Sequence, residues 1–143
     1  MNYRGFAVAL AFILLTAGFA QADLNAVIQD LNIRAEGNIG GFKAEMGARF
    51  GISGSHLDLA FRSVDSPADA AIVLWLGKCA GMPVPTVLER YRAHHGQGWG
   101  AVARSLGIKP GSAAFHALKE GNLLSQPGKN RRQETGKGKK KKG

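Results

Sequence analysis

This chain of 143 residues has almost no cysteine and no stretch with the pattern of a β-strand. Cys79 is the only cysteine, which excludes an intramolecular disulfide, a CxxCH haem attachment and a cysteine-based zinc cluster. No stretch shows sustained alternation of apolar and polar residues, which excludes half-buried strands. We therefore expect an all-α fold.

The first 22 residues have the pattern of a secretory signal peptide. Arg4 precedes an apolar run from Phe6 to Ala17, and Ala20 and Ala22 are small residues at the positions that a signal peptidase inspects. The run is too short to span a bilayer comfortably, which favours a cleaved signal over a membrane anchor. Removal of residues 1–22 from the 143 would leave 121 residues, enough for one domain, with no transmembrane span. The sequence thus predicts a periplasmic or secreted protein.

The net charge of +9 is concentrated at the C-terminal end. Residues 127–143 contain eight basic residues and only Glu134 as an acid, a net charge of +7, whereas residues 23–126 contain ten basic and nine acidic residues. The eight are Lys129, Arg131, Arg132, Lys137, Lys139, Lys140, Lys141 and Lys142. A tail with many like charges and nothing apolar to bury is expected to be disordered. Clustered cations bind polyanions by counterion release, so these eight residues form the predicted polyanion-binding site.

Glycines and capping residues divide residues 23–126 into about seven short helices, which we expect to pack as one compact domain. The expected helices are 23–36, 38–50, from Ser55 to about Val64, 67–80, 85–95, 99–106 and from Ser112 onward. In the second helix, the residues expected to face inward are Ile39, Phe42, Met46 and Phe50. Glu45 with Arg49, and Asp58 with Arg62, have the i, i+4 spacing of helical ion pairs.

Residues 67–80 are expected to form the centre of the core. Ser66 can cap the helix, Pro67 suits its first position, and the Asp69 carboxylate can reach back toward the cap. The remainder is apolar nearly all round, which is typical of a helix surrounded by others. Cys79 lies on one of these apolar faces, so we expect its thiol to be buried, although an unpaired thiol in an exported chain could also join two molecules.

The stretch from Gly96 to Gly121 predicts two helices joined by a tight corner. The residues that share one face of the first helix are Trp99, Val102, Ala103 and Leu106. Gly107 is expected to end that helix, Ile108 to fill the corner, and Ser112 to cap the next helix. Trp99 is expected to be a core residue whose loss would damage stability more than any other single change.

An internal echo links this corner to an earlier one. Residues 48–55 and 103–112 both contain Ala-Arg, a glycine followed by isoleucine, and then Gly-Ser. This similarity suggests two three-helix halves that flank the central helix. The alternative is coincidence, because a glycine stop before a capped helix is the usual way to build a tight helical corner.

No catalytic residue, cofactor site or metal site emerges from the motifs, so we do not expect an enzyme. There is no GxSxG elbow, and the serines stand where helix caps are needed. Residues 96–100 are rich in glycine, but Ala101 occupies the third glycine position of GxGxxG and no strand precedes it. His94 and His95 are adjacent on a helix, where they point about 100° apart and cannot chelate one metal through the same face.

The corner at 103–119 is similar to the helix-turn-helix of DNA-binding proteins, whose second helix reads the major groove. Here the second helix offers mainly Ala113, Ala114, His116, Ala117 and Lys119. This set has few groups for base edges or phosphates, and export would separate the protein from the chromosome, so the sequence argues against DNA as a partner.

Residues 66–119 resemble a group of small exported bacterial proteins of uncharacterised function. The pieces that carry the resemblance are GWG, LGIKPGS and FHALK. The resemblance implies a signal peptide and a helical domain, and it brings no activity, ligand or catalytic residue.

Three functional hypotheses follow. In the first, an exported, non-enzymatic helical module contacts an anionic surface or polymer through its basic tail. In the second, the helical body binds a small ligand or a metal near His94 and His95. The third, nucleic-acid binding through the helical corners, requires the signal-peptide interpretation to be wrong.

Overall fold

The computed structural model describes the backbone of residues 17–124 and the side chains of residues 23–124. Within this range the protein is all α-helical and compact, with seven α-helices and one short 3-10 helix. The helices are α2 (Ala17–Gly37), α3 (Ile39–Phe50), α4 (Gly54–Arg62), α5 (Pro67–Ala80), α6 (Val84–His94), η2 (His95–Gln97), α7 (Trp99–Ser105) and α8 (Ala113–Lys119). The predicted fold class is confirmed.

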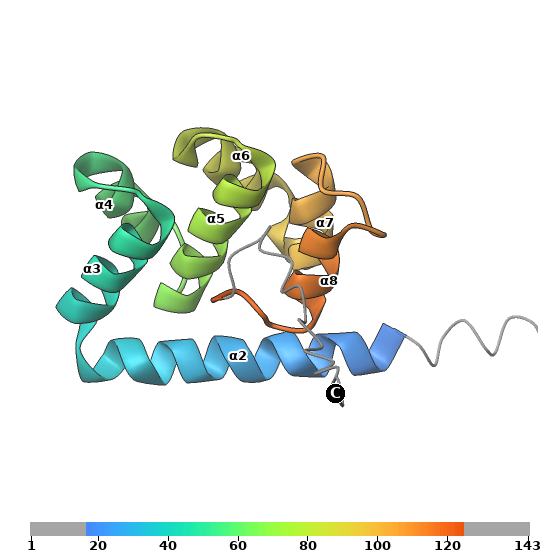
Figure 1. Cartoon of the computed structure of the whole chain (residues 1–143), viewed down its shortest axis with the longest axis horizontal. Helices are drawn as coiled ribbons and strands as arrows, with labels where there is room; N and C mark the ends of the chain where they lie inside the picture. The colour runs from blue at the N-terminus through green and yellow to red at the C-terminus, as the bar shows by residue number, and fades with distance from the viewer. Residues whose placement is uncertain (1–16, 125–143) are drawn as a thin grey trace, which may run out of the picture.

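The long helix α2 lies along one side of the molecule, and the other helices are arranged above it in Figure 1. Helices α3, α5 and α8 contact α2, while α4, α6 and α7 contact one another through α6. Helix α5 lies between these groups, in contact with α2, α3, α4 and α6. Because these four helices cover α5, it has no polar face.

Helix α5 is the centre of the core, as its sequence predicts. Its residues from Ala70 to Gly77 are all buried, and Trp75 is completely inaccessible to solvent. The Ser66 side chain accepts a hydrogen bond from the Asp69 backbone N–H at 3.2 Å, and Pro67 occupies the first turn. These local signals start the helix where its apolar residues can be covered on every side.

The glycine corner that the sequence contains twice occurs three times between helices of the described structure, and α8 ends in the same way at Gly121. Helices α3, α5 and α7 each end in a Schellman motif, in which a glycine in the left-handed region turns the chain back over the last helical turn. The glycines are Gly51, Gly81 and Gly107, with φ of +67°, +64° and +84°. The closing hydrogen bonds run from Ile52 N–H to Gly47 O, from Met82 N–H to Gly77 O, and from Ile108 N–H to Ala103 O.

The same corner explains a small residue four positions before each glycine. A Cβ on Gly47 would lie 2.8 Å from the Ile52 carbonyl oxygen, and one on Gly77 would lie 3.1 Å from that of Met82. Ala103 holds this position in the third corner. The similarity between residues 48–55 and 103–112 therefore reflects the same close packing at the end of a helix, and the middle corner lies at the end of the central helix α5.

Several expectations for the first helices are wrong in detail. Ile39, expected to face inward, is 52% exposed. Asn38 caps α3 by accepting a hydrogen bond from Gly41 N–H at 2.9 Å, which makes Ile39 the first helical residue and leaves it outside the core. The first helix is expected to begin at Asp23, whereas α2 begins at Ala17; signal cleavage itself stays a prediction.

The expected ion pairs are partly different as well. Glu45 pairs with Arg49 at 3.3 Å as predicted, and it also pairs with Arg34 of α2 at 3.2 Å. Asp58 pairs with Lys43 of α3, whereas Arg62 donates to the Asp58 backbone carbonyl at 3.4 Å. Contacts between helices thus replace the local pair that spacing predicts.

The last described residues cross the molecule after α8. Leu123 is buried, and Arg49 of α3 donates a hydrogen bond from Nη1 to the Leu124 carbonyl at 3.0 Å. Figure 1 shows this segment running from α8 toward the lower end of α5, above α2. The Arg49 side chain thus reaches from α3 to the segment that follows α8.

Candidate ligand-binding cleft

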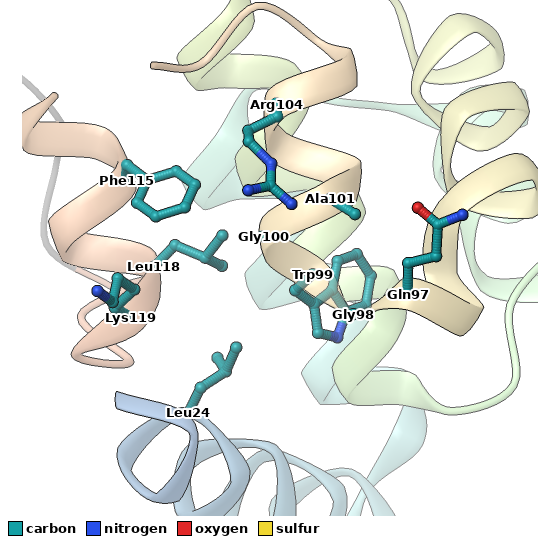
Figure 2. A pocket seen from close by; sticks show the side chains of 10 residues that line it. All are labelled: Leu24, Gln97, Gly98, Trp99, Gly100, Ala101, Arg104, Phe115, Leu118 and Lys119. Carbon is teal, nitrogen blue, oxygen red and sulfur yellow. The ribbon is translucent and has the colours of Figure 1, made fainter. Parts of the chain in front are cut away.

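A cleft of about 290 Å³ opens where α2, α7 and α8 meet (Figure 2). Its apolar lining comes from all three helices: Leu24 belongs to α2, Trp99 to α7, and Phe115 and Leu118 to α8. Phe115 and Leu118 are buried, while Leu24 and Trp99 are half-buried. The cleft is thus a partly covered apolar hollow at the edge of the core.

Trp99 forms a wall of this cleft and is not a fully buried core residue as the helical spacing predicts. It is the first residue of α7, and its ring lies 5.3 Å from the ring of Tyr91, centre to centre. One face of the indole therefore contacts the body while part of the ring remains accessible. Gly100 lies beside Phe115, and a Cβ there would make ordinary van der Waals contact with its ring at 3.5 Å.

The polar lining consists of hydrogen-bond donors with few acceptors. Arg104, Lys119 and Gln97 contribute side chains, and no lining residue is a carboxylate. In Figure 2 the Arg104 side chain extends toward the middle of the cleft between Phe115 and Trp99, while Gln97 and Lys119 lie at opposite edges. The Lys119 ammonium lies 6.0 Å from the centre of the Phe115 ring, within the range of a cation–π contact.

Arg104 and Lys119 have no ion-pair partner among residues 23–124. The ion pairs in that range join Arg34 and Arg49 to Glu45, and Lys43 to Asp58. No hydrogen bond from the Arg104 guanidinium or the Trp99 indole N–H to another described residue occurs either. The cleft therefore combines an apolar floor, formed by its apolar lining side chains, with hydrogen-bond donors that have no partner among the described residues.

Tyr91 packs against Trp99, which lines the cleft, and its hydroxyl lies within hydrogen-bond distance of two carboxylates. Its hydroxyl lies 3.3 Å from oxygens of both Asp65 and Asp69, and its ring stacks on His95 at 4.7 Å. Burial, reinforced by the charge of Asp69, raises the pKa of Tyr91 to about 12. Burial also raises the pKa of the Asp69 carboxyl, against the hydrogen bond from Tyr91 that lowers it. The phenol thus remains a donor at neutral pH and fixes the ring that contacts Trp99.

The histidines that the sequence singles out lie outside the cleft. His95 stacks on Tyr91, and His94 ends α6. Among the described residues, no three His, Cys, Asp or Glu side chains come together in a way that could hold a metal ion. The eight basic residues of 127–143 lie outside the described residues.

Cys79 packs against the core, as its position on an apolar face predicts, but it is only half-buried. It lies beside a second shallow hollow of about 360 Å³, formed with Leu106, Ile108 and Ser112. Burial raises the pKa of the Cys79 thiol to about 11. The sulfur is therefore reachable from solvent but remains protonated, and a protonated thiol is a poor nucleophile.

The α7–α8 corner, which is similar in sequence to a helix-turn-helix, packs against the body through its second helix. Helix α8 has seven residues, Ser112 caps it by accepting from Phe115 N–H at 3.2 Å, and it contacts α2. Its exposed side chains are those of Ala113, His116 and Lys119. The corner has a structural role in shaping the cleft.

Sequence reasoning did not identify the cleft as a site. Neither Arg104 nor Lys119 has an acidic residue three or four positions away, where a helical ion pair would form. This spacing is not specific to the cleft, because Lys43 shares it and pairs with Asp58 of another helix.

Comparison of the chain with protein-family models, curated proteins and solved structures finds no match. Within the described residues, no single helix is long and apolar enough to cross a membrane, and only the sharply bent pair α5 and α6 meets that criterion when the two are taken together.

Proposed function

We propose that this protein is an exported, non-enzymatic helical module whose folded body binds a small ligand in the cleft between α2, α7 and α8. The observation that carries the proposal is the convergence of an apolar floor with donors that have no partner in the described part of the protein. Ligand pockets commonly combine mostly apolar walls with a few polar groups that fix orientation. The site proposed here differs in place from the His94 and His95 region that the sequence suggests.

The chemistry of the lining supports binding without catalysis. Among the described residues that line the cleft there is no serine, cysteine, histidine, aspartate or glutamate, which are common nucleophiles and general acid–base groups. Lys119 is the one lining residue of a type that can act in this way, and it lies at the edge of the cleft, against Phe115. A ligand held there would meet donors and apolar walls.

The proposal can be tested with a variant that fills the cleft. Gly100 lines the cleft within a helix, so Gly100→Leu would add an apolar side chain there without loss of helix propensity. Small-molecule mixtures are screened by ¹H–¹⁵N spectra of the full chain, with the Trp99 indole signal as reporter. We expect compounds that shift this signal in the parent to leave it unchanged in Gly100→Leu, while Gly100→Ala still binds. If no compound moves the signal, the cleft is not a binding site.

A second function rests on the charge distribution. The net charge of +7 in residues 127–143 supports contact with an anionic surface or polymer, independent of the cleft. Replacement of Lys139–Lys142 by glutamine should reduce retention of the full chain on a polyanion column, and the difference should disappear as salt is raised. Unchanged retention at low salt would reject this role.

Export is a separate part of the proposal. It is supported by the apolar run after Arg4 and the small residues near Ala22. The intact mass of the protein recovered from cell fractions tests it. A cytoplasmic protein that retains Met1 would overturn export and would reopen nucleic-acid binding.

A further inference from the structure

We infer that the ligand of this cleft is a small aromatic carboxylate, held by Arg104 above the apolar floor. This inference rests on the proposed function, because it names the class of molecule that the same cleft binds. Three properties of the site support it, namely the sign of its charge, the position of its central donor and the nature of its walls.

The charge of the lining selects an anion. Arg104 and Lys119 are positive, and no carboxylate lines the cleft to balance them. Both side chains are exposed to solvent, so a cationic ligand would be repelled and a neutral ligand would gain no charge pairing with them. An anionic group that replaces water at these donors gains charge-assisted hydrogen bonds, which are stronger than neutral ones.

The position of Arg104 selects a head group with a single charge. Its side chain reaches toward the middle of the cleft, whereas Lys119 and Gln97 lie at opposite edges (Figure 2). One planar guanidinium matches one carboxylate through two parallel hydrogen bonds. The donors of this cleft are spread out, so they do not form the concentrated cluster that a phosphate group would need.

The walls select an apolar and flat body. The Trp99 indole and the Phe115 ring lie on two sides of the Arg104 guanidinium, with Leu118 and Leu24 beneath (Figure 2). Aromatic rings pack favourably on such walls in stacked or edge-on arrangements. Inorganic anions would leave this surface uncovered, which argues for an organic acid. The volume of about 290 Å³ is at the small end of ligand pockets, so it suits a single ring with a short acidic arm.

The test compares four probes that differ in one property each. Phenylacetate has the proposed chemistry, phenylacetamide has the same shape without charge, phenethylammonium has the opposite charge, and hexanoate has the acid without the ring. Each is titrated into the full chain at about 0.15 M salt, which screens the basic tail. The reporter is the Trp99 indole signal, assigned by its loss in Trp99→Phe, and the signal of the fully buried Trp75 is the internal reference.

We expect phenylacetate to bind about tenfold or more tightly than phenylacetamide, consistent with the strength of a hydrogen-bonded charge pair. Hexanoate should be weaker than phenylacetate, and phenethylammonium should not bind. Arg104→Gln should bring the affinities for phenylacetate and phenylacetamide together. The matched control Arg90→Gln, which removes an exposed arginine of α6 outside the cleft, should leave the preference intact.

The possible failures are distinguishable. Equal binding of phenylacetamide and phenylacetate to the parent would overturn the carboxylate class while the cleft remained a ligand site. Equal binding of hexanoate would overturn the aromatic part of the inference. A preference that survives Arg104→Gln would overturn the role of Arg104. If none of the four probes shifts the Trp99 signal, and the broader screen also finds none, the proposed function fails and this inference fails with it.

Discussion

The ring of Tyr91 lies 5.3 Å from the indole of Trp99, so the wall of the cleft rests on a residue that is itself anchored in the core. Tyr91 is only 4% exposed, and its hydroxyl is fixed by Asp65 and Asp69 at the start of α5. The residues at the start of the central helix therefore fix Tyr91, and Tyr91 in turn positions Trp99 at the cleft.

The first prediction concerns pH. Burial raises the pKa of Asp69 above its ordinary value of 3.8, so the folded chain binds more protons than the unfolded chain as pH rises from that value through the folded pKa. The free energy of unfolding contributed by this group therefore decreases over that interval and stays lower at neutral pH. We expect the change in the free energy of unfolding caused by Asp69→Asn to be more favourable at pH 7 than near pH 3, as measured by urea denaturation at both pH values. An equal change at both pH values would show that ionisation of Asp69 does not destabilise the folded state.

The second prediction compares the two tryptophans. Trp75→Ala should cost about 3–5 kcal/mol, because it empties a large site at the centre of the core. Trp99→Ala should cost clearly less, because part of the indole is already in contact with solvent. Chemical denaturation of both variants measures the difference. The reverse order would place Trp99 in the core, as the helical spacing alone predicts.

The third prediction concerns two glycines in helices. Gly47→Ala should destabilise the protein by about 1–3 kcal/mol, because its Cβ would meet the Ile52 carbonyl at 2.8 Å and the Leu57 side chain at 2.9 Å. Gly100→Ala should instead give a gain of up to about 1 kcal/mol, since its Cβ makes only ordinary contact with Phe115. Thermal melts of the two variants, side by side, test whether the corner or general helix propensity dominates.

The fourth prediction concerns the lone thiol. With the pKa of Cys79 raised to about 11, only about a thousandth of the thiol is ionised at pH 8. Iodoacetamide should therefore react much more slowly with the native chain than with the chain in urea, and the native rate should keep rising up to about pH 11. A native rate that levels off near pH 8.5, the ordinary value for a cysteine, would show that the thiol is solvated.

Local signals predicted much of the fold. The caps at Ser66 and Ser112, the glycine stops at Gly51 and Gly107, and the apolar surface of α5 depend on residues near one another in the sequence, and each has one local physical solution. Burial depth was harder to predict. Helical spacing tells which residues share a face, but it cannot tell that α7 begins at the edge of the core, which leaves its first residue, Trp99, partly exposed.

The candidate site could not be assembled from the sequence because its parts are distant from one another. Leu24, Arg104 and Phe115 meet only after α8 contacts α2. The partner of Asp58 was missed for the same reason, since Lys43 lies on another helix. The lack of an acidic residue three or four positions away does not single out Arg104 and Lys119, because Lys43, Lys78, Arg90 and Lys109 share it.

The hydrogen bond from Arg49 to the Leu124 carbonyl ties the segment after α8 back to α3. Arg49 does not line the cleft, so this attachment point is separate from the proposed ligand site. Arg49→Gln should therefore loosen the hold on residues 123 and 124 while leaving the affinity of the cleft unchanged.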